Sequence, residues 1–268
     1  MHSLSELFQN FSAVIVTGGS SGIGKSFISH IRTLNREILI CNLSRRIPEE
    51  REALDLRHFS CDLSQAEAVE RILPELESVL ARESPEGRIL LINNSGFGSH
   101  GLFPEPNLAH QLAMIGVNVR AVVQLTGRLL PLLKARGGVI VNVASTAAFQ
   151  PTPWMSTYGA TKAFLLHWSL ALNQDLRGTG VRTLAVCPGP TETEFSKRAG
   201  QGAGNPPSYH QESADEVVLA SLRALAAGRT QVVTGWRNKL GAAVSSIFPK
   251  PLVARMARRV IARHLMGK

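Results

Sequence analysis

Residues Ala13–Gly24 read AVIVTGGSSGIG and join a short apolar run to a glycine-rich turn. The run is rich in β-branched residues, which favour strands, and from Ile23 to Leu34 apolar residues recur at helical spacing. We therefore predict a strand, a turn and a helix. Glycines at positions 18, 22 and 24 would let backbone N–H groups approach a pyrophosphate without obstruction by Cβ atoms, although a tight strand-to-helix turn alone would also use glycine.

Further apolar runs alternate with amphipathic helical segments along the chain. The run Val139–Val143 is nearly continuous in β-branched apolar residues, as expected for a parallel sheet that is covered on both faces. The later strands are expected at Glu37–Leu43, Arg57–Asp62, Arg88–Ile92, Val139–Val143, Val181–Cys187 and Thr230–Val233. This alternation predicts an α/β fold, which binds its ligands at the edge where the strands end.

The composition is that of an ordinary globular protein, with 268 residues, 44% hydrophobic and 18% charged. No stretch reaches the ~18 uncharged apolar residues of a membrane-spanning helix, and the first apolar run is too short for a signal peptide, so we expect a cytoplasmic protein. Cys41, Cys61 and Cys187 are odd in number and far apart. They suit buried thiols better than disulfides or a metal site.

The net charge of +9 is unevenly distributed along the chain. Residues Met1–Glu216 contain 19 basic and 20 acidic residues, whereas Val217–Lys268 contains 10 basic residues and no acidic one. A dispersed basic surface would favour DNA, but this excess belongs to one end of the chain. We therefore expect no nucleic-acid partner.

Residues Ser156–Lys162 read STYGATK and place Tyr158 and Lys162 about one helical turn apart on one face. An isolated phenol titrates near ~10, but a neighbouring ammonium stabilises the phenolate and lowers the pKa. The pair is therefore a candidate acid–base centre. A core aromatic residue beside a solvated lysine would show the same spacing, so the pair gains meaning only from its surroundings.

Polar residues follow several expected strands. Asn93–Gly96 follows the fourth strand, Ser145 lies just past the fifth, and Pro188–Thr193 leaves the sixth. Residues Leu108–Ala135 are predicted as one long amphipathic helix with Asn118 in its middle. Since asparagine is a poor helix former there, it indicates a polar task inside the domain.

The second expected strand ends in Ser44–Arg46, where an NAD site would carry an acidic residue for the ribose 2′-hydroxyl. Two arginines stand there instead and can hold a 2′-phosphate, which favours NADP(H), although surface loops also carry such pairs. Asp62 is placed to face the adenine. Ser64 is predicted to cap a helix that runs to Arg82.

The C-terminal part has a different character. Residues Glu194–Gln211 are rich in Gly and Pro, with a length typical of lids and binding loops. Ser213 and Glu216 make a capping box for the next helix. Residues 236–268 show apolar stripes with arginines opposite, which can lie on anionic membranes, but we favour packing over the substrate cleft or a partner subunit. We thus expect a Rossmann-type domain over residues 1–235 and a basic amphipathic helical extension over residues 236–268.

Together these features resemble the short-chain dehydrogenase/reductase family, in its single-domain branch, over roughly Ser12–Val233. The family motifs match as TGxxxGxG from Thr17 to Gly24, NNAG at Asn93–Gly96, and the active-site set Asn118, Ser145, Tyr158 and Lys162. The chain departs from the pattern in three places. Ser95 replaces an alanine, the turn after the second strand is about two residues longer than usual, and Leu34-Asn35-Arg36 replaces the usual glycine before that strand.

The resemblance implies a doubly wound sheet of about seven parallel strands with helices on both faces, and a homodimer or homotetramer through the helices that carry Asn118 and Tyr158. It implies that Tyr158 exchanges a proton with the substrate oxygen, with its pKa lowered by Lys162, which also bonds the nicotinamide ribose. Ser145 would hold the substrate oxygen and Asn118 a relay water. The implied cofactor site comprises Thr17, Gly18, Ser20, Ser21, Gly22, Ile23, Gly24, Ser44, Arg45, Arg46, Asp62, Leu63, Asn94, Ser95, Gly96, Tyr158, Lys162, Pro188, Gly189, Thr191 and Thr193.

These expectations describe an NADP(H)-dependent oxidoreductase that acts on a small-molecule carbonyl or alcohol, which the apolar tail suggests is lipophilic. A decarboxylating or isomerising relative of the same fold is one alternative. A non-catalytic NADP(H)-sensing regulator or scaffold is another, although such proteins typically lose the tyrosine or lysine that this chain keeps.

Overall fold

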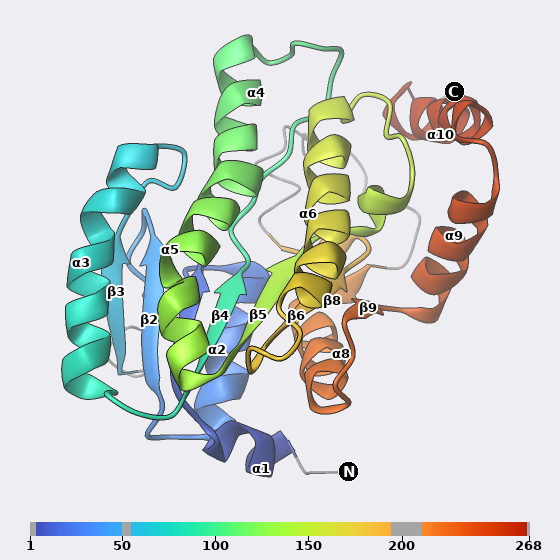
Figure 1. Cartoon of the computed structure of the whole chain (residues 1–268). Coiled ribbons are helices and arrows are strands. Elements are labelled where there is room, and N and C mark those ends of the chain that lie inside the picture. The colour runs from blue at the N-terminus through green and yellow to red at the C-terminus, as the bar shows by residue number, and fades with distance from the viewer. Residues whose placement is uncertain (1–3, 50–54, 194–210, 267–268) are drawn as a thin grey trace.

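The computed structural model describes residues 4–49, 55–193 and 211–266, with the backbone alone for 260–266. Its centre is a parallel seven-stranded sheet in the order β3-β2-β1-β4-β5-β6-β9 (Figure 1). The strands are β1 (Phe11–Thr17), β2 (Leu39–Ser44), β3 (Leu56–Ser60), β4 (Arg88–Asn93), β5 (Gly138–Val143), β6 (Val181–Cys187) and β9 (Gln231–Val233). The doubly wound α/β prediction is confirmed. The strand order reverses between β1 and β4, where such folds leave a binding crevice.

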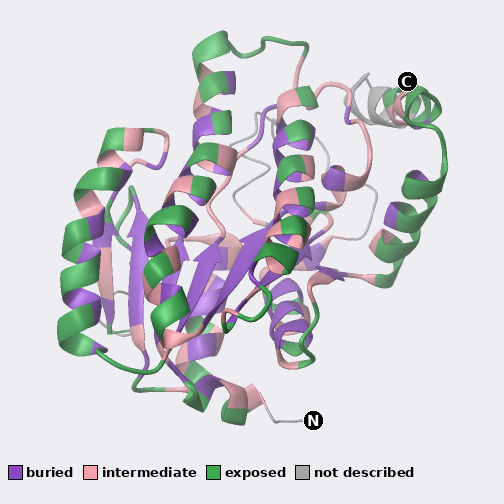
Figure 2. Cartoon of the chain, viewed as in Figure 1, coloured by how far each residue is buried: buried purple, intermediate pink, exposed green. Residues whose placement is uncertain are grey.

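Two hydrophobic cores lie on opposite faces of the sheet, and Figure 2 shows the strands buried between them. Because successive residues of a strand point to opposite faces, Val14 and Val16 join one core while Ala13 and Ile15 join the other. The first core is covered by α1 (Leu4–Gln9), α2 (Gly22–Leu34) and α8 (Ala214–Ala226). The second face is covered by α3 (Ala66–Glu83), α5 (Ala121–Arg136) and α6 (Ser156–Asp175).

The helix predicted to begin with a Ser64 cap begins later, so that prediction is wrong. The Ser64 N–H donates to Asp62 Oδ1 at 2.9 Å, and the Gln65 N–H donates to the Asp62 carbonyl at 3.0 Å. These bonds close a tight turn after β3, and α3 starts at Ala66 with no side-chain cap. Ser64 therefore belongs to the turn.

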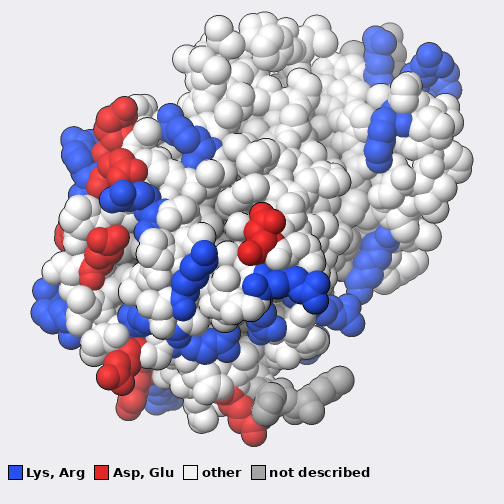
Figure 3. Space-filling view, in the orientation of Figure 1, with Lys and Arg blue, Asp and Glu red and all other residues white. Residues whose placement is uncertain are grey.

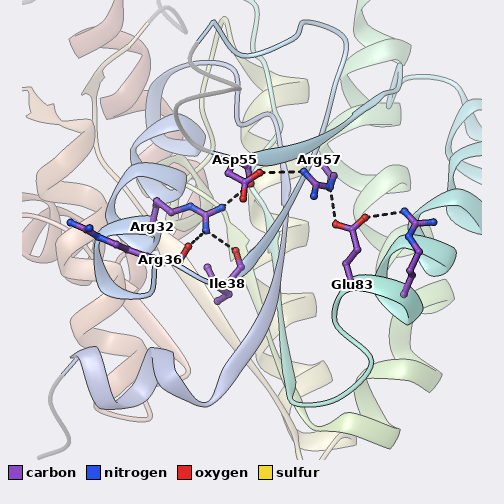
Figure 4. A network of polar contacts seen from close by, with 7 residues as sticks. Arg32, Arg36, Ile38, Asp55, Arg57 and Glu83 are labelled. Atoms are coloured by element: carbon purple, nitrogen blue, oxygen red, sulfur yellow. Dashed lines mark hydrogen bonds and ion pairs between the residues drawn. The ribbon is translucent and has the colours of Figure 1, made fainter.

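The missing glycine before β2 has a structural reason. Asn35 ends α2 with a φ of −146°, an extended conformation that needs no glycine. Nearby, charged side chains connect the ends of α2 and α3 to the starts of β2 and β3 (Figure 4). Arg32 donates to the carbonyls of Ile38 and Asp55, and Arg57 pairs with Glu83 at 2.8 Å. This network lies at the amino edge of the sheet, opposite the edge where the strands end.

The C-terminal helices lie beyond β9 (Figure 1). They are α9 (Trp236–Ile247) and α10 (Lys250–Met266). The predicted capping box of Ser213 and Glu216 is confirmed at the start of α8. The expected lid segment Glu194–Gln211 lies outside the described residues except for Gln211. The strands β7 (Thr191–Glu192) and β8 (Glu212–Ser213) pair in parallel on either side of it.

No helix in the described part of the chain combines the length and the hydropathy needed to cross a bilayer. The prediction of buried free thiols is confirmed for Cys41, Cys61 and Cys187. Burial raises the pKa of Cys41 and Cys187 to about 12 and that of Cys61 to about 11, so these thiols are protonated and unreactive at neutral pH.

Candidate active site

A cavity of about 820 Å³ lies at the carboxyl ends of β1, β2, β4, β5 and β6. Three of the predicted site residues, Thr17, Gly24 and Asn118, are not among its lining residues. The other predicted residues line it together, namely Gly18, Ser20, Ser21, Gly22, Ile23, Ser44, Arg45, Arg46, Asp62, Leu63, Asn94, Ser95, Gly96, Ser145, Tyr158, Lys162, Pro188, Gly189, Thr191 and Thr193. The fold thus gathers at one cavity residues that are far apart in the sequence.

The glycine turn after β1 depends on the absence of side chains. Gly18 has a φ of +72°, in the left-handed region that disfavours a Cβ atom. A Cβ atom at Gly24 would lie 2.3 Å from the Gly18 carbonyl oxygen, so α2 can begin this close to the turn only with glycine. The Gly18 and Gly19 N–H groups donate to Leu43 O and Asn42 Oδ1 at 2.9 and 2.8 Å, which fixes the turn against β2.

The start of α2 forms part of the cavity wall. Ser21 is its N-cap residue and makes no side-chain cap bond. Gly22 and Ile23 follow it along the cavity. A helix N-terminus presents free N–H groups and a partial positive charge, which attract phosphate groups. With the turn held open by glycine, this end of the cavity fits the pyrophosphate of a dinucleotide.

Thr17 and Asn94 join β1 to β4 at the point where the strand order reverses. The Thr17 hydroxyl accepts hydrogen bonds from the N–H groups of Asn94 at 3.0 Å and Ser95 at 2.9 Å. In return, Asn94 Nδ2 donates to the carbonyls of Thr17 at 2.9 Å and Gly18 at 3.2 Å. The polar residues of the two motifs therefore hold the cavity floor in one conformation.

The two arginines after β2 lie on different sides of the cavity end. Arg46 Nη2 donates to the Ser21 hydroxyl at 3.4 Å, which brings this guanidinium over the start of α2. Burial favours the neutral form of Asp62, but hydrogen bonds from Ser64 and the charge of Arg45 outweigh it and lower the Asp62 pKa. Ser44 is buried and donates to the Arg46 carbonyl at 2.8 Å. Arg45 and Arg46 are exposed at the cavity, whereas Ser44 shapes the turn that carries them.

Asn118 occupies a π-helical turn, η1 (Gly116–Arg120), between α4 (Leu108–Ile115) and α5. The predicted single helix is therefore interrupted by one wider turn. Asn118 is fully buried, accepts from the Phe97 N–H at 3.1 Å and donates to the Phe97 carbonyl at 3.0 Å. Its Nδ2 also donates to Thr161 Oγ1 at 3.1 Å, which links it to α6. Asn118 therefore fixes the segment after β4 against the helix of Tyr158.

Ser145, Tyr158 and Lys162 meet on one wall of the cavity. Ser145 follows β5 and its hydroxyl hydrogen-bonds to Tyr158. The Lys162 Nζ donates to the Val143 carbonyl at 2.8 Å and lies 5.8 Å from the centre of the Tyr158 ring. A Cβ atom at Gly96 would lie 3.2 Å from Lys162 Nζ, so the small residue leaves room for the lysine. The acid–base candidates are thus assembled from β5, α6 and the segment after β4.

Burial controls the protonation of this pair. It raises the pKa of Tyr158 to about 12, although the hydrogen bond from Ser145 acts in the opposite direction. It lowers the pKa of Lys162 to about 8. The expected lowering of the Tyr158 pKa by Lys162 is not observed, because desolvation dominates and the ammonium is held by the Val143 carbonyl. Tyr158 is therefore protonated at neutral pH.

Several lining residues were not predicted from the sequence. Phe97, His100, His110, Val117 and Met155 also line the cavity. Burial lowers the pKa of His100, which favours its neutral form. Apart from their position after β4 or before α6, nothing in the sequence distinguishes these residues.

Asn42 was also missed, although its signal was present. It is a fully buried amide within an apolar strand, and it bonds the Gly19 N–H. A polar residue at such a position needs a partner, which could have been sought in the glycine turn.

The C-terminal segment contacts the cavity wall through Asn238. A Cβ atom at Gly189 would lie 2.2 Å from Asn238 Nδ2, so α9 packs directly on the turn after β6. The buried Glu212 accepts from Thr234 Oγ1 at 2.6 Å and from Asn238 Nδ2 at 2.9 Å. One carboxylate therefore joins β8, the end of β9 and α9.

Comparisons with known proteins agree with this geometry. The family model for short chain dehydrogenases matches residues 12–204. Sulfoacetaldehyde reductase 2 of Chromohalobacter salexigens is 33% identical over 194 residues, which cover 68% of this chain and 74% of that protein. Serine 3-dehydrogenase of Agrobacterium fabrum is 32% identical over 194 residues, which cover 68% of this chain and 73% of that protein.

A solved structure is similar over most of the chain. The short-chain dehydrogenase from Sphingobium yanoikuyae in complex with NADPH superposes with a TM-score of 0.72 at 27% identity. The superposition covers 90% of this chain and 97% of that one.

Proposed function

The chain belongs to the short-chain dehydrogenase/reductase family, and on that premise we propose that it is an NADP(H)-dependent oxidoreductase of lipophilic carbonyl or alcohol substrates. Membership supports an oxidoreductase that uses a nicotinamide cofactor. The observation that carries the proposal is the meeting of Ser145, Tyr158 and Lys162 at one wall of a cavity whose far end is lined by the glycine turn. When bound there, the dinucleotide supplies or accepts the hydride.

In the proposed reaction, Tyr158 exchanges a proton with the substrate oxygen. Its raised pKa keeps the phenol protonated at neutral pH, which is the form that carbonyl reduction requires. The Ser145 hydroxyl lies within hydrogen-bonding reach of the phenol and would hold the same oxygen as negative charge gathers on it. Lys162 would stabilise the phenolate that remains after the proton is given, since it is the ammonium nearest to the ring among the described lining residues. Asn118 would act through the Phe97 backbone and a relay water.

The NADP(H) preference is supported by charge at the end of β2. Arg45 and Arg46 extend from the turn over Asp62 and Ser21, and Ser44–Arg46 contains no carboxylate for a ribose 2′-hydroxyl. Two guanidinium groups match the geometry of a phosphate. The relative from Sphingobium yanoikuyae was solved with NADPH, which agrees with this preference.

The substrate class is supported by the opposite end of the cavity. Phe97 and Met155 offer apolar surface, and burial favours neutral His100. Among the described lining residues, the permanent cations Arg45 and Arg46 stand at the cofactor end. An uncharged, apolar carbonyl compound fits this lining better than a small anion.

A homo-oligomer is supported by exposed apolar residues on α4, which leads into the turn of Asn118, and on α6, which carries Tyr158. Leu108, Leu112 and Ile115 on α4 are 55%, 58% and 42% exposed, and Phe164 on α6 is 39% exposed. A second copy of the chain would cover such surface. Sedimentation velocity on Leu112→Asp against the unaltered chain would measure this association.

The experiment that tests the function measures NADPH and NADH oxidation across a panel of aldehydes, ketones and β-keto acyl compounds. We expect Tyr158→Phe to lower kcat by about 10²–10⁴-fold on every accepted carbonyl, since it removes the proton donor and leaves the binding surface. Thr157→Val is the matched control, because it removes a neighbouring hydroxyl that does not line the cavity. Thr157→Val should keep the turnover and the NADPH affinity of the unaltered chain.

Three outcomes would contradict parts of the proposal. Unchanged turnover by Tyr158→Phe would exclude the proton-transfer role. Activity that tracks small polar compounds would exclude the lipophilic substrate class. NADPH binding without turnover of any panel member would favour a cofactor-sensing regulator.

A further inference from the structure

The surface of α9 inverts the usual order of buried and exposed residues. It buries the small residues Ala242 and Ser245 and exposes large apolar ones. Trp236, Leu240, Val244 and Ile247 are 71%, 60%, 44% and 80% exposed. Their spacing of three to four residues places them on one side of the helix. Packing on the core of this chain therefore leaves the apolar stripe in solvent.

The stripe continues into the next helix. Phe248, Leu252 and Met256 are 49%, 44% and 56% exposed, whereas Val253 is buried. We call these three residues, together with Trp236, Leu240, Val244 and Ile247, the tail apolar face. An exposed apolar surface that spans two helices marks a contact site.

Basic side chains accompany the tail apolar face. The exposed cations of this segment are Arg237, Lys239, Lys250, Arg255, Arg258 and Arg259. The sequence from Val217 to Lys268 contains no acidic residue to offset them. In Figure 3, the visible part of α9 and α10 shows basic and no acidic side chains. The segment is therefore apolar and positively charged at the same time.

The charge pattern indicates which kind of partner binds the tail apolar face. A symmetric contact between two copies would set each patch against itself and would oppose these cations to one another. An anionic lipid surface instead accepts apolar side chains between its headgroups and attracts the surrounding cations. We propose that α9 and α10 form a peripheral membrane-binding surface that recognises anionic phospholipid bilayers. This differs from the favoured sequence interpretation, because the apolar stripe faces away from the core.

The surface is joined to the catalytic domain by polar contacts. Asn238 bonds Glu212 at 2.9 Å, and Lys250 Nζ donates to the carbonyls of Phe149 at 3.0 Å and Ser245 at 3.1 Å. These contacts hold the face in place beside the domain, so binding requires no rearrangement of the core.

Vesicle co-sedimentation of the full chain tests the proposal. We expect recovery with phosphatidylcholine vesicles that contain phosphatidylglycerol, little recovery with phosphatidylcholine alone, and loss of binding at high salt. Leu240→Ser with Ile247→Ser should lower the apparent affinity by about tenfold or more, because it removes apolar side chains that enter the lipid. Arg255→Glu with Arg259→Glu should abolish the preference for anionic vesicles.

Matched controls separate these effects from unfolding. Phe103→Ser removes an apolar residue that is 66% exposed outside the tail, and Arg177→Glu reverses an exposed charge outside it. Both should bind vesicles like the unaltered chain, and all variants should keep its circular dichroism. Equal recovery with neutral and anionic vesicles, or no recovery with either, would overturn the proposal. So would a tail variant that dissociates an oligomer while lipid binding is absent throughout.

Discussion

At the scale of single residues, burial shifts Tyr158 and Lys162 in opposite directions and toward their neutral forms. The Tyr158 pKa rises to about 12 and the Lys162 pKa falls to about 8. A charged lysine inside the domain is a cost to stability at neutral pH, which the hydrogen bond to Val143 offsets only in part. The proposed chemistry therefore uses Lys162, whose buried charge lowers the stability of the fold.

We predict that Lys162→Met stabilises the protein at pH 7 while it abolishes turnover. The unfolded chain keeps the lysine pKa near 10.5, so between about 8 and 10.5 the unfolded state binds more protons and the stability of the unaltered chain rises with pH. The free energy of unfolding of Lys162→Met should exceed that of the unaltered chain by on the order of 2 kcal/mol below pH 8. This difference should decrease as pH approaches 10.5. Urea unfolding at pH 7 and pH 10 measures it.

Lys134→Met is the control for this prediction, since Lys134 is exposed. Its effect should be small and nearly independent of pH. An advantage of Lys162→Met that is equally large at both pH values would show that the effect comes from packing and not from the buried charge.

The sequence predicted those site residues whose type is dictated by local backbone geometry or by motif spacing. Gly18 and Gly24 are examples, because a side chain at either position would disturb the turn. Asn42 could not be assigned in this way, since its partner Gly19 is 23 residues away and meets it only when β1 and β2 pair. The lining by Phe97 and Met155 depends in the same way on how distant segments meet.

At the scale of elements, the π-helical turn η1 explains why an asparagine occupies the middle of a long helix. The wider turn carries Asn118 to Phe97 and Thr161, where its amide makes three hydrogen bonds. Such turns occur often at functional sites. Apolar periodicity predicted a continuous helix because a single turn of different width hardly alters the pattern over so many residues.

We predict that Asn118→Ala destabilises the protein by about 2–4 kcal/mol, because the part-buried Phe97 backbone groups and the buried Thr161 hydroxyl lose their hydrogen bonds to Asn118. Asn107→Ala, at the N-cap of α4, is a matched control and should cost about 1 kcal/mol. Chemical denaturation compares the two. A similar loss in both variants would mean that Asn118 is no more than an ordinary helix residue.

At the scale of the whole molecule, the cavity is a property of sheet topology. The segments that follow β1, β4, β5 and β6 are far apart in the sequence. They meet at the cavity because these strands are neighbours in the sheet and end at the same edge. The sequence predicted this edge because alternating strands and helices imply a parallel sheet. The sequence could not predict which side of α9 faces the core, because an amphipathic pattern alone does not decide this. In the structure the small residues Ala242 and Ser245 face the core and the large apolar residues face solvent.

We predict that NADPH raises the melting temperature of the whole chain more than NADH does. A ligand at about a hundred times its Kd stabilises by about 2.7 kcal/mol, which corresponds to about 5–10 °C for a protein of this size. The double variant Arg45→Ala/Arg46→Ala should reduce the NADPH shift to that of NADH, because both guanidinium groups are lost. Differential scanning fluorimetry measures this.

Arg177→Ala provides the control for lost positive charge and should keep the full NADPH shift. A larger shift with NADH, or an unaltered NADPH shift in the double variant, would contradict the assignment of the arginines to the 2′-phosphate.

The short pairing of β7 with β8 has a consequence for how such a protein can diversify. Thr191 lies opposite Glu212, so the chain leaves the cavity before residue 194 and returns after residue 210 at adjacent points. At the returning end, Glu212 is held by hydrogen bonds from Thr234 and Asn238. A sequence exchanged between these two ends, taken from a relative or a library, would therefore begin and finish at positions that the β7–β8 pairing already sets side by side.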